Sequence, residues 1–361
     1  MAESVYIHIP FCRQKCKYCS FVSFAKQELI EDYIKALLSE IRERYGKEKL
    51  KTLYFGGGTP SLLSPAHFEK ILTQFDFAEN HEITTEVNPE FLTEEYLKNI
   101  FDLGINRISI GVQTFNRNIL ALIGRKHTVS DIFRAVELSK SAGFKNISID
   151  LIYGLPEQTP EDFEKTLETA VSLDVTHISS YGLKIDEGSY FYGNIPENLP
   201  DSDMQADMYL KMSEFLEENG FKHYEISNFA KDGFNSRHNI NYWNAKEYYG
   251  FGCASCGYEN KTRYSHENTL EKYIKNPKNL IKEPPLTERE MLEEYIFLGL
   301  RKKEGINISY VKERFKTDFY SKYGDILQKY SEYFEKNGEN INLTDNGFLI
   351  SNIILSEFID T

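Results

Sequence analysis

Short apolar runs recur along the first two-thirds of the chain and are bounded by Gly or Pro. The runs are rich in Ile, Val and aromatic residues, which is typical of strands. We predict six strands from this pattern: Val5–Ile9, Thr52–Phe55, Ile83–Val87, Arg107–Val112, Ile147–Tyr153 and His177–Leu183.

Stretches with apolar positions at helical spacing lie between these runs. Two helices are predicted from spacing alone, at Glu28–Tyr45 and at about Ser130–Ala142. Three more begin at cap signals: Ser64-Pro65, Thr93, and Thr159-Pro160, where Asp162 is placed to complete a capping box. Successive β–α units of this kind predict an α/β fold with a parallel sheet, open or closed into a partial (β/α)6 barrel like part of a TIM barrel.

The strict alternation fades after about Pro200. The remaining sequence predicts helices with a few short strands, ending in "NINLTDNGFLISNIILSEFI". We therefore expect two domains. Residues 1–220 hold the partial barrel, and residues 221–361 form a smaller, mainly helical domain, although no Gly/Ser-rich or Pro-rich linker marks the boundary.

Composition narrows the class of protein. Apolar residues make up 41% and charged residues 27%, which are globular values. The net charge of −13 argues against a nucleic-acid binder, since the only notable basic run, Arg301–Lys303, is short and followed by Glu304. No apolar stretch approaches the roughly 20 residues of a membrane span. Met1–Ser4 lacks the features of a signal peptide, so we expect a cytoplasmic location.

Three of the five cysteines lie in "HIPFCRQKCKYCSF", where Cys12, Cys16 and Cys19 have the spacing C-x3-C-x2-C. In a reducing cytosol, clustered cysteines indicate a metal site or catalysis rather than disulfides. Three thiolates leave one metal position without a cysteine. A zinc site completed by a histidine such as His8 and chance clustering are the simpler readings. We favour a 4Fe–4S cluster with one open iron, which suits a small molecule that chelates iron.

Further polar motifs follow the predicted strands: "GGGTP" after the second, "NPE" after the third, "QTF" after the fourth and "GLP" after the fifth. That rim of a parallel β/α fold is where ligands bind. Glycines there let the backbone approach a ligand and offer N–H groups to a carboxylate. Glu86 is either a ligand contact or a solvated strand end. Asp150, in an otherwise apolar strand, needs a partner because an unpaired buried carboxylate is costly.

The cysteine motif resembles that of the radical S-adenosylmethionine (SAM) superfamily. With "YIHIPFC" it resembles, within that superfamily, the oxygen-independent coproporphyrinogen III oxidase-like family, which includes the HemW-type heme chaperones. The resemblance runs in order through most of the chain. It implies that SAM occupies the open iron of the cluster held by Cys12, Cys16 and Cys19. It also implies SAM contacts from Tyr6, Tyr18, Gly57, Gly58, Thr59, Glu86, Gln113, Arg125 and Asp150.

A second motif lies downstream in "SRHNINYWNAKEYYGFG". A lone histidine is more often a satisfied structural group than a ligand, but imidazole binds heme iron and aromatic rings suit a flat macrocycle. The pattern H-N-x-x-Y-W resembles the heme-binding motif of the HemW group. It implies heme contacts from His238, Asn239, Tyr242 and Trp243.

Cys253 and Cys256 form a C-x2-C in "GFGCASCGY". We favour two small residues packed under a loop, with a zinc or redox role left open.

Two functions are compared. One is a heme chaperone that delivers heme to acceptor hemoproteins such as respiratory cytochromes; the other is the oxidase, which decarboxylates two propionates of coproporphyrinogen III. The oxidase is expected to carry a further cysteine where Phe21 stands, and a long extension before its cluster motif, where this chain has eleven residues. Both features and H-N-x-x-Y-W favour the chaperone, so we assign no catalytic residue. Another radical SAM reaction on a porphyrin stays open.

The SAM motifs need a reason in a heme carrier. We hypothesise that cluster and SAM binding tune heme transfer by promoting a homodimer, and that membrane association occurs only through a partner.

Overall fold

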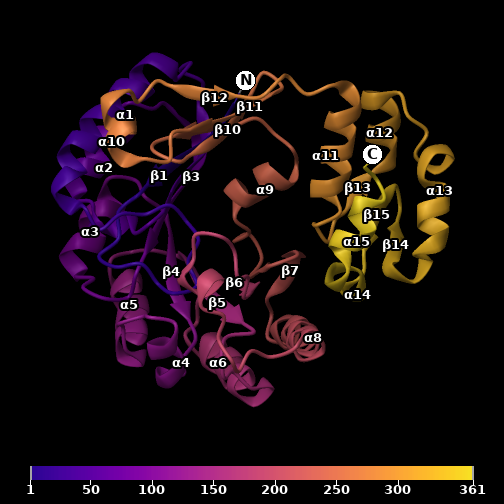
Figure 1. Cartoon of the computed structure of the whole chain (residues 1–361), viewed down its shortest axis with the longest axis horizontal. Helices are drawn as coiled ribbons and strands as arrows, with labels where there is room; N and C mark the ends of the chain where they lie inside the picture. Colours follow the sequence, from indigo (N-terminus) through magenta and orange to yellow (C-terminus); the bar gives the residue numbers. More distant parts are fainter. Residues whose placement is uncertain (1, 360–361) are drawn as a thin grey trace.

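The computed structural model describes residues 2–359. Met1 and residues 360–361, at the outer ends of the two predicted domains, lie outside the described residues. All six predicted strands are present and all are parallel, with helices on the outer side of their sheet (Figure 1). The strands are β1 (Ser4–Ile9), β2 (Leu50–Gly57), β3 (Phe77–Val87), β4 (Arg107–Gln113), β5 (Asn146–Tyr153) and β6 (His177–Gly182).

The sheet is a partial barrel. Its strand order is β7-β8-β6-β5-β4-β3-β2-β1-β9, so the six predicted strands are neighbours in chain order. Three short strands extend the two sides: β7 (Lys222–Glu225), β8 (Asn228–Ala230) and β9 (Tyr249–Phe251). β9 pairs with β1 in parallel, and β8 pairs with β6 in antiparallel orientation. β7 and β9 remain unpaired with each other, which leaves the barrel open.

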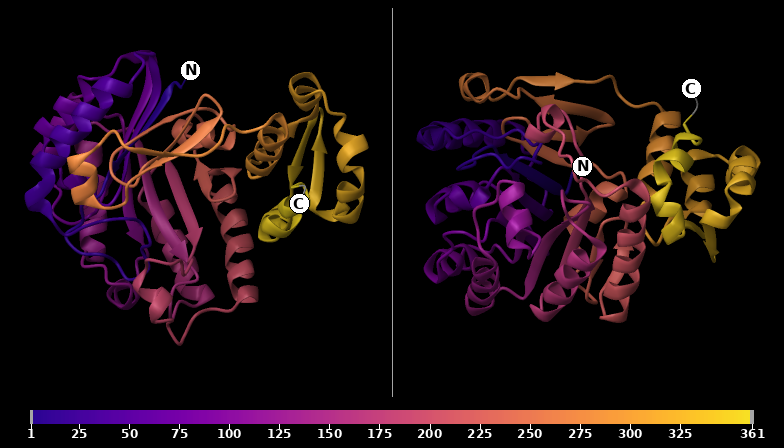
Figure 2. Two further views of the ribbon diagram at one scale, coloured as in Figure 1. Left: turned by 45° about the horizontal axis from the view of Figure 1, so that its top comes forward. Right: turned by 60° about the horizontal axis from the view of Figure 1, so that its bottom comes forward.

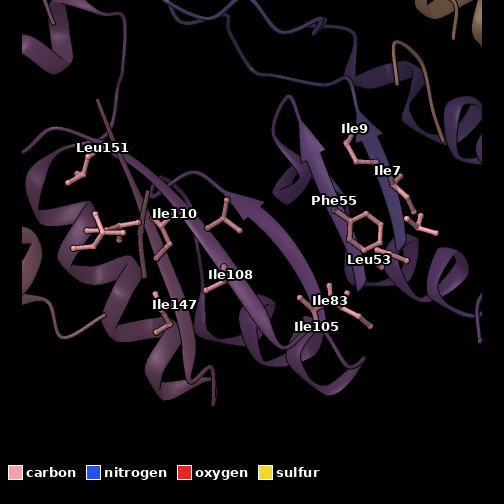
Figure 3. Close-up of a cluster of buried hydrophobic side chains, with 14 of the residues drawn as sticks. Ile7, Ile9, Leu53, Phe55, Ile83, Ile105, Ile108, Ile110, Ile147 and Leu151 are labelled. Atoms are coloured by element: carbon pink, nitrogen blue, oxygen red, sulfur yellow. The ribbon is translucent and has the colours of Figure 1, made fainter. Parts of the chain in front are cut away.

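The two faces of the sheet differ in chemistry. Side chains alternate between the faces of a strand, so one set packs under the helices. That set is apolar and buried (Figure 3), and includes Ile7, Ile9, Leu53, Phe55, Ile83, Ile108, Ile110, Ile147 and Leu151. The other set faces inward and is largely polar. We call this inner space the barrel lumen; Tyr6, Tyr54, Glu86, Ser109 and Asp150 belong to it.

The outer helices are those predicted, with local differences. They are α1 (Ile30–Arg44), α2 (Pro65–Leu72), α3 (Glu94–Asp102), α4 (Arg117–Leu122), α5 (Val129–Ser141) and α6 (Pro160–Ser172). The predicted start of the first helix is a 3-10 turn, Gln27–Leu29, and the prediction missed α4.

The capping box predicted at α6 is only half formed. The Thr159 hydroxyl oxygen accepts the backbone N–H of Asp162. The Asp162 carboxylate, however, accepts a hydrogen bond from the Thr159 hydroxyl and not from the Thr159 backbone N–H. A complete box caps α5, where Thr128 and Asp131 bond reciprocally.

The chain after β6 closes the ends of the sheet. α7 (Tyr190–Gly193) lies in the loop after β6, as the short 3-10 turn Pro60–Leu62 lies in the loop after β2. α8 (Ser202–Glu218) packs beside α6. α9 (Arg237–Trp243) contacts both β2 and α11, at the open side of the barrel (Figure 1). A three-stranded antiparallel sheet with a helix then covers α1; its elements are β10 (Cys256–Glu259), β11 (Thr262–His266), α10 (Leu270–Lys275) and β12 (Leu280–Lys282).

Residues 288–356, which we call the C-terminal unit, form a separate group of helices around a small sheet (Figure 2). Its elements are α11 (Glu288–Gly299), β13 (Ile306–Asn307), α12 (Ile308–Phe315), α13 (Phe319–Lys329), Ser331–Tyr333, β14 (Phe334–Asn337), β15 (Asn340–Leu343), α14 (Asp345–Leu349) and α15 (Ser351–Ser356). The mainly helical C-terminal region is thus as predicted. The exact division at residue 220 stays a prediction.

Main-chain bonds join the C-terminal unit to the edge of the barrel. Ile226 N–H donates to Arg301 O at 2.9 Å, and Lys303 N–H donates to Tyr224 O at 3.1 Å. Residues 301–303 therefore continue the sheet beyond β7. No helix within residues 2–359 is both long and apolar enough to cross a membrane.

Candidate functional site

The three clustered cysteines lie on one closed loop after β1. Phe24 N–H donates to Pro10 O at 2.8 Å and Cys12 N–H donates to Phe24 O at 3.1 Å, which joins the two ends of the loop. Lys17 N–H donates to Ile123 O at 3.0 Å and holds the middle of it. All three cysteines are unpaired and half-buried. The loop therefore presents three thiols at the carboxyl end of the sheet.

His8 does not complete a zinc site in this structure. Its Nε2 donates to Val22 O at 2.9 Å, and its Nδ1 accepts the Tyr6 hydroxyl at 3.0 Å. Both ring nitrogens are thus occupied. Throughout residues 2–359, no three His, Cys, Asp or Glu side chains converge to hold a single metal ion. His8 is thus held by hydrogen bonds away from the three thiols, and the zinc alternative has no histidine in place as its fourth ligand among the described residues.

The thiols fit a cluster of several irons. Burial raises the pKa of Cys19 to about 11, and the nearby Cys16 and Cys12 add to the rise. Cys19 is therefore sensitive to negative charge on its two neighbours in the loop. Binding to positively charged iron offsets that charge, since cysteine ligates iron as the thiolate.

A chain of polar side chains links two of the cysteines. Thr59 Oγ1 lies 3.4 Å from Cys12 Sγ and accepts Asn88 Nδ2 at 3.3 Å. Arg125 Nη2 donates to Asn88 Oδ1 at 3.0 Å, and its Nη1 lies 3.7 Å from Cys16 Sγ. Asn88 stands at the centre of this chain, and the sequence prediction missed it. The "NPE" motif after β3 was the signal that contained it.

The glycine loop after β2 packs closely against the start of the cluster loop. Gly57 has φ +108°, and a Cβ there would lie 2.4 Å from the His8 ring. A Cβ at Gly58 would lie 2.6 Å from Phe11 O. We expected N–H groups of this loop to face a ligand carboxylate. Instead, the N–H of Gly58 donates to Ile9 O at 2.9 Å and the N–H of Thr59 donates to Phe11 O at 2.7 Å.

Two carboxylates line the upper lumen. Glu86 accepts the Tyr54 hydroxyl at 2.9 Å and the Gly57 N–H at 3.2 Å. Burial, with the charge of Asp150 adding to it, raises the pKa of Glu86 to about 7. Asp150 is half-buried rather than buried, and the partner that it needs is Ser109, whose hydroxyl donates at 3.0 Å. Burial also raises the pKa of Asp150.

The other residues implied as SAM contacts surround the same rim. Tyr6 stacks on Tyr54 with ring centroids 6.2 Å apart. Gln113 is buried at a bulge at the end of β4, with φ +70°. Tyr18 packs against a small apolar cluster that includes Ile119. Eight of the nine thus lie at or near the carboxyl end of the sheet, whereas Tyr6 lies in the middle of β1. The roles of all nine stay predictions.

The H-N-x-x-Y-W motif forms α9, and its histidine points into the lumen. His238 is buried, and its Nδ1 lies 2.8 Å from Thr52 Oγ1. The Thr52 hydroxyl donates to Ser4, so Nδ1 carries the proton of the imidazole. Nε2 then accepts the Tyr242 hydroxyl at 2.8 Å. Burial lowers the pKa of His238 to about 3, with the Arg107 charge adding to the fall.

The heme motif and the cysteine loop lie at different levels of the lumen. His238 bonds to Thr52, five residues before Gly57 on β2. At about 3.3 Å per residue, Thr52 and Gly57 lie roughly 16 Å apart along the strand. Asn239 and Trp243 are half-buried on the same helix. As the structure stands, Tyr242 covers the histidine nitrogen that would bind iron.

The two cysteines of the second pair differ in solvent exposure. Cys253 is buried and its Sγ donates to Glu267 O at 3.3 Å. Burial raises the pKa of Cys253 to about 12. Cys256 is exposed at the start of β10, so the expected packing under a loop holds for Cys253 alone.

Two family models match the chain. The Radical SAM superfamily model matches residues 6–170, and the HemN C-terminal domain model matches residues 286–350. The first range runs from β1 into α6, and the second covers most of the C-terminal unit.

Curated relatives match over nearly the whole length. The protein named heme chaperone HemW of Lactococcus lactis subsp. lactis (strain IL1403) is 39% identical over 99% of this chain and 97% of its own. The protein of the same name from Bacillus subtilis (strain 168) is 35% identical over 99% of both chains. The solved structure of Escherichia coli coproporphyrinogen III oxidase (HemN), a radical SAM enzyme, matches 98% of this chain and 89% of its own with a TM-score of 0.86. Its sequence identity of 23% limits that likeness to the fold.

Proposed function

We propose, from the premise that this chain belongs to the HemW family of the radical SAM superfamily, that it is a heme chaperone. It binds heme and passes it to acceptor hemoproteins such as respiratory cytochromes. The observation that carries the proposal is the full-length similarity to relatives named as heme chaperones. Phe21, which stands where the oxidase is expected to have a cysteine, supports the same choice.

Membership of the superfamily implies a 4Fe–4S cluster and SAM. We propose that Cys12, Cys16 and Cys19 bind three irons and that SAM occupies the fourth. A cluster held there would supply one-electron redox chemistry next to SAM. The chain's own contribution is to hold the sulfurs. Thr59 meets Cys12 and Arg125 meets Cys16, so polar N–H and O–H groups face two of the three thiolates.

The remaining rim residues would hold SAM. Tyr6, Tyr18, Gly57, Gly58, Glu86, Gln113 and Asp150 complete the proposed SAM site. The two carboxylates suit the positive groups and hydroxyls of SAM. Because Glu86 has a raised pKa of about 7, its charge state changes near neutral pH and a bound cation would hold it ionised.

Heme would bind lower in the lumen, through α9. We propose that His238 Nε2 binds the iron after the Tyr242 hydroxyl leaves it, and that Asn239, Tyr242 and Trp243 contact the macrocycle. The stacked rings of Tyr54 and His238, 5.2 Å apart, support a site for a flat aromatic ligand.

The assembly and location belong to the same proposal. Loading of the cluster and SAM promotes a homodimer that tunes heme transfer. The protein works in the cytoplasm, and it reaches membranes only through partner proteins. Neither nucleic acid nor a membrane is a direct partner, in keeping with the net charge of −13.

One pair of anaerobic assays on reconstituted protein tests the function. The first measures heme binding by absorption, and the second measures decarboxylation of coproporphyrinogen III. We expect heme binding that His238→Ala weakens, and no decarboxylation. Decarboxylation at enzymatic rates would replace the chaperone by the oxidase. A matched control is His81→Ala, which removes a histidine whose side chain bonds to the local carbonyl of Ala78 and packs on Phe77.

A further inference from the structure

Among residues 2–359, one buried arginine of the lumen forms no hydrogen bond and no close ion pair. Arg107, the first residue of β4, is 2% exposed and is among the largest fully buried side chains. Within residues 2–359 its guanidinium makes no hydrogen bond or ion pair, and its Nε is buried without an acceptor. A buried charge without a partner is costly, and proteins rarely keep one.

Neighbouring groups place Arg107 at mid-height in the lumen. Its positive charge acts on the carboxylates above, Glu86 and Asp150, and on His177 and His238 below. None of the four forms a hydrogen bond or ion pair with it. Glu86 is bonded to Tyr54 and the glycine loop, and Asp150 is bonded to Ser109. The two nearby carboxylates therefore form their hydrogen bonds with other groups.

A second unpartnered group stands beside the arginine. Thr84 on β3 is in register with Arg107 on β4, so both side chains point to the lumen. The Thr84 hydroxyl is buried and has no hydrogen-bond partner. Two adjacent donors, one of them charged, thus face the lumen without an acceptor. This donor pair suits a carboxylate, which the guanidinium fork binds in bidentate fashion.

Register partners on neighbouring strands lead from this donor pair to the H-N-x-x-Y-W motif. Tyr6, Tyr54, Thr84 and Arg107 are successive register partners across β1, β2, β3 and β4. The Tyr54 ring stacks on the His238 ring. Two strand spacings, about 10 Å, separate Tyr54 from Arg107. The space above them admits solvent, since Tyr54, Glu86 and Asp150 are only half-buried and Tyr181 is 43% exposed.

We propose that Arg107 and Thr84 form a carboxylate-binding site in the lumen, and that it takes a propionate of heme. The source of the carboxylate rests on the proposed function, which places heme beside His238. The site fixes the orientation of the porphyrin, with its carboxylate edge toward β3 and β4 and its iron toward α9. It also explains why the protein keeps a buried cation that its own anions leave unpaired.

The test compares heme with heme dimethyl ester, whose propionates carry no charge, by absorption titration in the same detergent. Wild-type protein should bind heme at least about tenfold more tightly than the ester, because a charge-assisted bond to a buried group is worth at least that factor. Arg107→Gln should lose the preference, and Arg107→Lys should keep part of it. Arg42→Gln, which removes an exposed arginine on α1, should behave as wild type.

Each other outcome has a definite meaning. Equal wild-type affinities for heme and ester overturn the site, and this comparison does not depend on the folding of any variant. A preference that survives in Arg107→Gln also overturns it. Loss of SAM binding by Arg107→Gln, with the heme preference intact, assigns the carboxylate to SAM and overturns the heme assignment. Failure of wild-type protein to bind either porphyrin contradicts the proposed function itself.

Discussion

At the scale of single residues, the state of His238 is set by its two neighbours. Thr52 fixes the proton on Nδ1, and Tyr242 occupies the lone pair of Nε2. The histidine is therefore in the tautomer that binds iron through Nε2, with a hydroxyl in the way. In this structure it is a hydrogen-bonded core histidine, and in the proposed function heme would have to displace Tyr242 from it.

Replacing Tyr242 by Phe tests that competition. The variant keeps the ring that packs on Tyr248 and removes only the hydroxyl bond. We expect heme to bind about fivefold more tightly, because a hydrogen bond worth about 1 kcal/mol no longer opposes it. Absorption titration measures the change. An affinity equal to wild type, with the spectrum of the complex unchanged, would show that Tyr242 does not cover the ligating atom.

The raised pKa of Glu86 gives a pH-dependent stability. Its folded value of about 7 lies above the unfolded value of about 4.3, so the folded chain holds a proton that the unfolded chain releases. Stability should therefore fall as pH rises from about 4 to about 7. Glu86→Gln has no such carboxyl, so its free energy of unfolding should not show this fall. The free energy of unfolding of the variant minus that of wild type should therefore be up to about 3 kcal/mol larger at pH 8 than at pH 4. Denaturant unfolding at both pH values measures it; a constant difference would be contrary evidence.

Asn88 carries a prediction about the cluster. Asn88→Ala removes the link between Thr59 and Arg125, so Arg125 is less firmly held against Cys16. Since hydrogen bonds to cluster sulfur raise the reduction potential, we expect a more negative potential in the reconstituted variant. Electron paramagnetic resonance during a redox titration reads this directly. Asn118→Ala, at an exposed position on α4, is the control, and an identical potential in Asn88→Ala would refute the link.

At the scale of elements, α9 depends on strands far away in sequence. Both oxygens of buried Glu82, on β3, accept N–H groups of α9: Arg237 N at 3.1 Å and His238 N at 3.0 Å. A carboxylate at a helix N-terminus is favourable because it satisfies free N–H groups and the helix dipole. A helix of seven residues, too short to be stable alone, is thereby fixed in the lumen.

Glu82→Ala should release α9. We expect faster hydrogen exchange of the α9 amides, a stability loss of about 2 kcal/mol and weaker heme binding. Glu79→Ala, at an exposed site on the same strand, should leave all three unchanged. Normal α9 exchange in Glu82→Ala would mean that other contacts hold the helix.

The elements also show what the sequence could predict. The six strands and most of their helices were predictable because apolar periodicity and caps such as Thr93 and Thr159 are local signals. The cysteine spacing was equally local. Three features were not predictable because each depends on contacts between strands that are distant in the chain. They are the hydrogen-bond partners of His238, the lack of a partner for the Arg107 guanidinium among the described residues, and the role of Asn88. α4 was missed because its six residues offer too short a pattern.

At the scale of the whole molecule, the two proposed ligand sites lie at different levels of one lumen. The cysteines and most of the proposed SAM residues lie at or near the carboxyl end of the sheet, and α9 lies below them at the open side. The C-terminal unit continues the sheet past β7 and contacts α9 through α11. The helix that carries the H-N-x-x-Y-W motif is therefore in direct contact with the C-terminal unit.

Heme transfer is the most direct measure of the central claim. Protein loaded with heme and reconstituted with its cluster and SAM is mixed anaerobically with an apo-cytochrome, and the absorption of the holo-cytochrome is followed. We predict that the cytochrome fills faster than with His238→Ala protein given the same heme. Filling at the same rate from both proteins, or no transfer from heme-loaded wild type, would contradict a chaperone.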